Sequence, residues 1–154
     1  MTAQPQTATA VEYGYLHPTF VYFDDLDSMG MVHNARYAIM VERALTTFWH
    51  QRGYTRVNGV PTHPDTVVAV VEYSISYKVP VIGPGDIFIH LWVDRIGKTS
   101  VTYGFRALSA DRAVVHAEGH RVHIRLDEET LQKAPWAEET RAIYESLRPS
   151  SSAA

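Results

Sequence analysis

One helical segment in the first half of the sequence, NARYAIMVERALTTFWHQRG (residues 34–53), constrains the fold more than any other feature. It is rich in helix formers and ends at Gly53, a residue type that favours the end of a helix. At about 1.5 Å per residue, a helix of roughly 19 residues runs close to 28 Å. Apolar residues recur along it at spacings of three and four and also fall between these positions, which leaves little purely polar surface. We therefore expect the rest of the chain to wrap around this helix.

Strands are predicted on both sides of the helix. Before it, TFVYFDD (residues 19–25) is a short strand candidate. After it, apolar residues alternate with polar ones from Val71 to Val79, until Pro80 ends the strand. Short turns then separate three further segments, at residues 87–96, 101–108 and 113–126. We predict that these four strands form an antiparallel meander, followed by a second helix at AEETRAIYESL.

This order of elements predicts one α+β domain, in which a single antiparallel sheet curls around one long central helix. A chain of 154 residues that is 45% hydrophobic has the length and composition of one domain with a real core. We assign residues 13–148 to this domain. The ends, residues 1–12 and 149–154, are small, polar and proline-containing, so we predict that they are disordered tails.

The composition excludes several classes of function. The sequence has 14 basic and 17 acidic residues without long blocks of like charge, so we expect no nucleic acid and no acidic membrane surface as partner. It has no cysteine, which excludes disulfides and thiolate nucleophiles. The segment MTAQPQTATA lacks the basic start and apolar centre of a signal peptide, and no apolar run is long enough to cross a bilayer. We expect a cytoplasmic protein that acts on a small molecule or another protein.

Three motifs that suggest other chemistry do not fit. IGKTS is no phosphate loop, because Trp92 stands where a glycine is required. The run from Asp25 is no calcium loop, because Arg36 stands where a bidentate Glu is required. His116, His120 and His123 cannot converge on one metal ion from a single strand, so we interpret them as surface or interface residues. We predict no metal site.

The stretch DDLDSMGMVHNARY (residues 24–37) concentrates polar side chains just before the helix. The segment between Asp27 and Asn34 must fold back in a tight loop, which Gly30 makes possible. Such a loop can place a carboxylate beside the start of a helix, where free N–H groups can polarise a carbonyl oxygen. The carboxylate could then attack the carbonyl carbon or activate water. On the residues alone, a plain turn or helix-capping role stays open.

The residues FDDLDSMGMVHNARYAIMVERA resemble the signature of hotdog-fold acyl-CoA thioesterases of the 4-hydroxybenzoyl-CoA thioesterase type, which reads approximately D-x-x-G-H-V-N-N-A-x-Y-x-x-x-x-E-x-A. The resemblance continues through YSISYKVPVIGPGD and covers about residues 18–126, so the C-terminal helix lies outside it. It implies the hotdog fold, and hydrolysis of an acyl thioester to a free acid and a thiol without a cofactor. The expected substrate is the thioester of coenzyme A or of an acyl-carrier protein.

The resemblance also implies roles for individual residues. Asp27 matches the catalytic carboxylate, as nucleophile or general base, and Asn34 matches the position whose backbone N–H polarises the thioester carbonyl. We predict His33 as a third catalytic residue, although it could instead cap the helix. Met31 and His33 depart from the pattern, which usually has His at the first of these positions and often Asn at the second.

Two helix residues and Met31 are predicted to bind the substrate. Tyr37 matches a helix residue near the family's site, and Glu42 matches the helix glutamate. Glu42 could also act as a second carboxylate, or could simply pair with Arg36 or Arg43.

The resemblance implies an assembly as well. Family members are dimers or tetramers whose sites lie between subunits. A strand such as IFIHLWV, which is apolar on both faces, must also be buried on both faces, and a partner subunit could cover one of them. We therefore expect a homo-oligomer, a dimer or a homotetramer. Alternatives to a thioesterase are a hotdog hydratase or dehydratase, a non-catalytic acyl-carrier-binding or regulatory hotdog protein, and a purely structural oligomerising domain.

Overall fold

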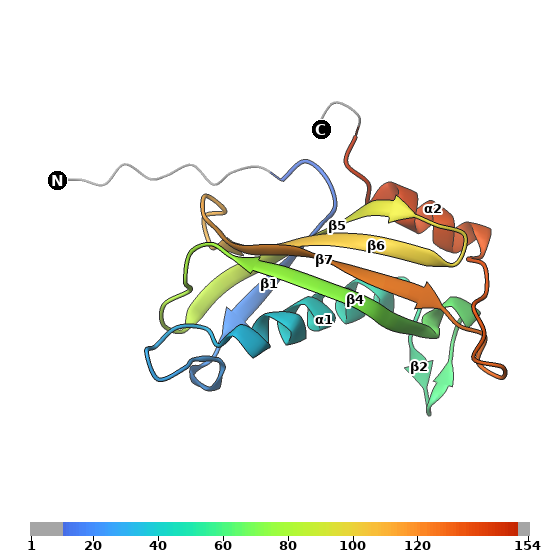
Figure 1. Cartoon of the computed structure of the whole chain (residues 1–154), viewed down its shortest axis with the longest axis horizontal. Helices are drawn as coiled ribbons and strands as arrows, with labels where there is room; N and C mark the ends of the chain where they lie inside the picture. The colour runs from blue at the N-terminus through green and yellow to red at the C-terminus, as the bar shows by residue number, and fades with distance from the viewer. Residues whose placement is uncertain (1–10, 151–154) are drawn as a thin grey trace.

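The structure is a computed structural model that describes residues 11–150 (Figure 1). Most of each predicted tail, residues 1–10 and 151–154, lies outside the described residues. In chain order the elements are β1 (Tyr15–Val21), the 3-10 turn η1 (Phe23–Asp25), α1 (Asn34–His50), β2 (Arg56–Val57), β3 (Val60–Pro61), the 3-10 turn η2 (Pro64–Thr66), β4 (Val68–Tyr77), β5 (Gly85–Ile96), β6 (Ser100–Ser109), β7 (Val115–Arg125) and α2 (Glu138–Ser146).

A five-stranded antiparallel sheet forms most of the molecule, with α1 lying across one of its faces (Figure 1). This confirms the predicted α+β architecture of one sheet around one central helix. The strand order is β1-β5-β6-β7-β4, so the predicted four-strand meander is wrong. Only β5, β6 and β7 follow one another in space, whereas β4 pairs with β7 at the far edge, with Ile75 opposite Gly119. Alternation along β4 predicts which side chains share a face, but it says nothing about the neighbouring strand.

The first strand starts and ends earlier than predicted. It covers Tyr15–Val21 and pairs with β5, and the segment after it forms the turn η1 instead of continuing the strand. The cause is Asp25, whose buried carboxylate accepts a hydrogen bond of 2.8 Å from the backbone N–H of Tyr22. A carboxylate that bonds to its own backbone in this way competes with strand pairing.

The central helix is buried along one face and not on all sides. Its buried residues recur at spacings of three and four and pack against the sheet; they are Tyr37, Met40, Val41, Ala44, Leu45 and Phe48. The other face, which includes Ile39 and Arg43, is exposed in the described chain. The expectation that the chain wraps the whole helix is therefore wrong.

Strand β5 is apolar on both faces, as predicted, but both faces are covered within the chain. Ile89 and Leu91 face α1 and are fully buried. On the opposite face, the rings of His90 and Trp92 pack against Tyr13, with ring centroids 5.1 Å and 5.9 Å apart. This strand consequently gives no reason to expect a partner subunit.

The second helix, α2, closes the end of the core beside the last turn of α1. The ring of Tyr144 lies 5.2 Å from that of Trp49 and 5.0 Å from that of Trp136. Ahead of α2, the buried carboxylate of Asp65 accepts a hydrogen bond of 2.8 Å from the N–H of Ala137. Within residues 11–150, neither helix has the length and apolar character needed to span a bilayer.

Candidate active site

The loop before α1 is closed by hydrogen bonds to Asp27. Its Oδ1 accepts from the backbone N–H groups of Met29, at 2.8 Å, and Met31, at 3.2 Å. Its own N–H donates to the Met31 carbonyl at 2.7 Å, and Gly30, with φ of 77°, donates to the Asp27 carbonyl. These bonds fix the orientation of the carboxylate, and they occupy only Oδ1. Among residues 11–150, Oδ2 has no hydrogen-bond partner.

The start of α1 leaves one backbone donor open. His33 is the N-cap residue, and its Nδ1 accepts a hydrogen bond of 3.1 Å from the N–H of Ala35. The N–H of Asn34 has no partner within the described part of the chain. At a helix N-terminus, a donor without a partner, added to the positive end of the dipole, is a good site for a carbonyl oxygen or an anion. The capping role, which the sequence left open for His33, is thus present in the structure.

One cavity of about 440 Å³ brings most of the predicted site residues together. It is lined by Asp27, Met31, Val32, His33, Asn34, Tyr37, Tyr77, Lys78, Val79, Pro80 and His116. Asp24 and Asp25 do not line it: Asp24 is exposed, and Asp25 is buried beside Arg36, with 3.8 Å between Oδ1 and Nε. Of the neighbouring carboxylates, Asp27 alone faces the space at the start of α1.

Two tyrosines form the wall between α1 and the end of β4. The rings of Tyr37 and Tyr77 lie 5.6 Å apart, and the Tyr77 hydroxyl donates to the Asn34 carbonyl at 3.4 Å. Burial raises the pKa of Tyr37 above its ordinary value, and Tyr77 raises it further. Tyr37 therefore stays neutral at physiological pH and can serve as a wall or a hydrogen-bond donor, but not as a base.

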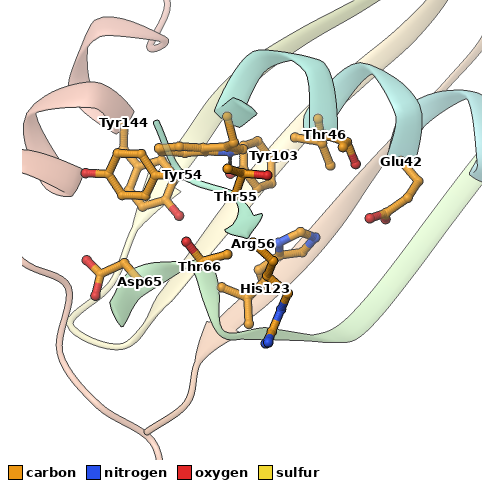
Figure 2. A pocket seen from close by; sticks show the side chains of 13 residues that line it. Glu42, Thr46, Tyr54, Thr55, Arg56, Asp65, Thr66, Tyr103, His123 and Tyr144 are labelled. Carbon is orange, nitrogen blue, oxygen red and sulfur yellow. Dashed lines mark hydrogen bonds between the residues drawn. The ribbon is translucent and has the colours of Figure 1, made fainter. Parts of the chain in front are cut away.

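Glu42 lies outside this cavity, so the structure does not bring it together with Asp27. Its carboxylate forms an ion pair with Arg121 of β7, and not with Arg36 or Arg43, the partners weighed from the sequence. It lines a second cavity of about 410 Å³ (Figure 2). That cavity lies between α1, β7, α2 and the segment from Tyr54 to Val68.

The sequence did not point to this second cavity. His123 lines it and is only 7% exposed, so the interpretation of His123 as a surface or interface residue is wrong. Arg121 is equally buried, and its Nε donates to His123 Nε2 at 2.8 Å. The available signal was the period of two in β7, which places Arg121 and His123 on the same face as the core residue Ala117.

The sequence profile of the thioesterase superfamily matches residues 29–116, more than half of the chain. The chain belongs to this superfamily, and with the fold this confirms the resemblance to hotdog thioesterases. The match includes Asn34, Tyr37 and Glu42, begins two residues after Asp27 and ends before Arg121.

Solved structures agree with this assignment. The PA5185 protein of Pseudomonas aeruginosa is 26% identical, with a TM-score of 0.80 over 90% of this chain and 94% of that one. A candidate acyl-CoA thioesterase of Xanthomonas campestris is 29% identical, with a TM-score of 0.66 over 80% of this chain and 100% of that one. A thioesterase of Thermus thermophilus, solved with coenzyme A and zinc, shares the fold at 21% identity, with a TM-score of 0.71 over 89% and 98% of the two chains. No curated protein matches the sequence.

Proposed function

We propose that this protein hydrolyses an acyl thioester to a free acid and a thiol. The observation that carries the proposal is the shared cavity at the start of α1, which is lined by both Asp27 and Asn34. One group there can attack or activate water, and the other can polarise a carbonyl. Membership of the thioesterase superfamily supports the same reaction class.

The mechanism follows from the two open groups. The thioester carbonyl oxygen would accept a hydrogen bond from the Asn34 N–H, which stabilises the negative charge that develops on it. Asp27 would either attack the carbonyl carbon directly, with water later cleaving the anhydride, or take a proton from the attacking water. In both routes the carbon–sulfur bond breaks and the sulfur leaves as the thiol after gaining a proton. In the water route the oxygen of water enters the acid directly; in the anhydride route water attacks one of the two anhydride carbonyls, which releases the acid and restores the Asp27 carboxylate. The reaction needs no cofactor.

The surrounding residues would position these two groups. His33 holds the first turn of α1 through Ala35 and thereby fixes where the Asn34 N–H points. Met31 and Tyr37 would form the apolar walls on either side of the thioester. We assign His33 a positioning role, because the cap already uses its Nδ1 as an acceptor.

Coenzyme A is the carrier we propose, with an acyl-carrier protein as the alternative. The support comes from relatives: the Thermus thermophilus thioesterase was solved with coenzyme A, and the Xanthomonas campestris protein is described as an acyl-CoA thioesterase. Lys78 also lines the cavity; its side chain is half exposed and pairs with Glu118, with 3.7 Å between Nζ and Oε1, so its charge is partly offset before an anionic carrier approaches.

The substitution Asp27→Asn tests the proposal. We expect the variant to fold normally and to lose at least about 10²-fold in kcat/KM for acyl-CoA hydrolysis, the lower range for loss of a positioned acid or base. The amide keeps an oxygen that can accept from Met29 and Met31, so the loop should persist. Release of free thiol would be followed with a chromogenic thiol reagent, and folding by circular dichroism.

Asp24→Asn is the matched control, since Asp24 is a neighbouring exposed carboxylate that does not line the cavity. It should keep full activity. Nearly wild-type turnover by a folded Asp27→Asn variant would overturn the mechanism. Binding of acyl-CoA without hydrolysis by the wild-type protein would favour the non-catalytic binding protein instead.

A further inference from the structure

The second cavity lies further along α1 than the first: Leu45 lines the second, whereas Tyr37 lines the first. Between the two, Tyr77, Ile75 and Tyr73 of β4 face α1: Tyr77 packs on Tyr37, and Tyr73 stacks on the core residue Phe105 with ring centroids 5.7 Å apart. Tyr73 and Tyr77 are partly exposed in the described chain. An apolar floor therefore leads from the start of α1 towards the second cavity.

The walls of the second cavity combine apolar rings with a few polar groups. Figure 2 shows Tyr54 and Tyr144 at one end and Glu42 at the other, with the ring of His123 between them. Trp49 and Tyr103 complete the aromatic wall, and the Trp49 ring N–H donates to the Tyr103 hydroxyl at 3.0 Å. A mainly apolar pocket with a few polar groups is typical of a small-molecule site.

The tautomer of His123 is fixed by its neighbour. Arg121 can only donate, so the 2.8 Å contact from its Nε makes His123 Nε2 an acceptor. In the neutral ring the proton must then sit on Nδ1. No residue among 11–150 accepts a hydrogen bond from Nδ1. This atom is nevertheless not fully buried, so it remains accessible to a ligand. Because His123 lines the cavity and is otherwise buried, the open side of Nδ1 is the cavity.

The neutral state of His123 is secured by its surroundings. Burial lowers its pKa to about 3, and the positive charge of Arg121 contributes to the shift. Across the physiological range His123 thus presents one uncharged N–H donor to the cavity. Opposite it, Glu42 uses Oε2 to pair with Arg121, which leaves Oε1 without a hydrogen bond within the described chain.

We propose that the second cavity binds the distal part of the acyl group, and that His123 Nδ1–H donates a hydrogen bond to an oxygen atom carried there by the substrate. The inference rests on the proposed thioesterase function and names its substrate class: acyl thioesters of medium length with a distal hydroxyl group. A hydroxyl can accept from His123 and donate to Glu42, whereas a carboxylate would be repelled by Glu42.

The geometry sets the length of the acyl group. Glu42 and Leu45, which line the second cavity, lie 8 and 11 positions after Asn34. At about 1.5 Å per residue, they lie about 12 to 17 Å further along the helix. With carbon–carbon bonds of about 1.5 Å in a zigzag chain, this span corresponds to roughly ten to fourteen carbons.

The test compares acyl-CoA thioesters that differ only at the distal end. Unsubstituted and ω-hydroxylated acyl-CoA substrates, from octanoyl to tetradecanoyl, would be assayed with the wild-type protein. We expect kcat/KM for the best ω-hydroxy substrate to exceed that of its unsubstituted counterpart by at least about tenfold, since the unsubstituted chain leaves a buried donor unpaired. Equal values across all pairs would overturn the inference.

Variants at His123 show whether this residue provides the preference. His123→Phe keeps the ring shape without the donor, and should reduce the ratio of ω-hydroxy to unsubstituted kcat/KM to about one. His123→Asn places an amide N–H near the position of Nδ1 and should restore part of the ratio. His120→Phe is the matched control: this histidine of the same strand pairs with Glu72 on the outer side and lines neither cavity.

Binding provides a readout that does not depend on turnover. Free ω-hydroxydecanoic acid and decanoic acid would be titrated while following the tryptophan fluorescence of the protein, because Trp49, one of its three tryptophans, lines the second cavity. We expect tighter binding of the hydroxy acid to the wild-type protein and no difference with His123→Phe. If no acyl-CoA is hydrolysed, the proposed function fails. If hydrolysis occurs without either preference, only the inference about His123 fails.

Discussion

His123 should also make stability depend on pH. Its pKa is about 3 in the folded protein, against 6.5 for the free side chain, because burial and Arg121 oppose the charged form. Between these values the unfolded chain binds a proton that the folded chain does not, so the free energy of unfolding falls as the pH falls. At about 1.4 kcal/mol per pH unit, this residue costs about 2 kcal/mol between pH 7 and pH 5.

The prediction is checked by urea unfolding at fixed protein concentration, for the wild-type protein and His123→Phe. The variant should lose less stability than the wild type between pH 7 and pH 5. His17 and His90, whose pKa values are also lowered by burial, are present in both proteins and cancel in the comparison. Identical pH slopes would mean that His123 is not held neutral.

Residues of the first cavity were easier to predict than those of the second. Asp27, His33 and Asn34 are close in sequence, so loop length and helix-start chemistry bring them together. His123 faces the helix only through the pairing of β7 with its neighbours, which local sequence does not specify. Glu42 illustrates the same limit: its face on α1 could be predicted, but its partner Arg121 could not.

At the scale of elements, one buried carboxylate helps to attach the start of α2 to the domain. Asp65 forms an ion pair with Arg125 of β7, with 2.6 Å between Oδ1 and Nε, and its Oδ2 accepts from the N–H of Ala137, just ahead of α2. Both side chains of the pair are largely buried, at 1% and 15% exposure. One residue thereby ties the turn η2, the last strand and the second helix together.

We expect Asp65→Ala to lower the free energy of unfolding by about 3 kcal/mol, because it leaves the buried charge of Arg125 unpaired. Hydrogen exchange should accelerate in α2 more than in α1, since α2 loses one of its attachments and α1 loses none. Glu128→Ala is the control: its pair with Arg56 is exposed, at 59% and 47%, and should be worth at most about 1 kcal/mol. An Asp65→Ala variant as stable as the control would contradict this role.

The sequence specified most elements but not their arrangement. The spans of α1, α2, β5, β6 and β7 follow from local periodicity, and the structure places them within a few residues of the prediction. The place of β4 could not be predicted, because its connection to β5 is short enough to suggest a hairpin while its actual partner is β7. Gly119 contributes to this pairing: a Cβ there would lie 1.9 Å from the Ser74 carbonyl oxygen.

At the scale of the whole molecule, the edge strand β4 is unusually apolar for an exposed strand. Val68, Val70, Val71, Tyr73 and Tyr77 are between 36% and 55% exposed. An edge of this kind presents unpaired backbone groups beside apolar side chains, which favours pairing with another strand. The same strand borders the first cavity, so a partner seated on it would also complete the walls of the proposed active site.

We therefore predict at least a dimer, formed through β4. Light scattering at micromolar concentration should give a mass of at least twice the 17.4 kDa of one chain. Val71→Lys should shift the mass towards the monomer, because the substitution places a charge on the exposed edge. Val60→Lys is the matched control, since Val60 is also exposed, at 65%, but lies on the β2–β3 hairpin away from that edge.

If the wild-type protein were a single species of 17.4 kDa, the exposed face of β4 would need another explanation, and the proposed site would have to work within one chain. A monomeric Val71→Lys variant that also loses thioesterase activity, while Val60→Lys keeps both, would tie the assembly to catalysis.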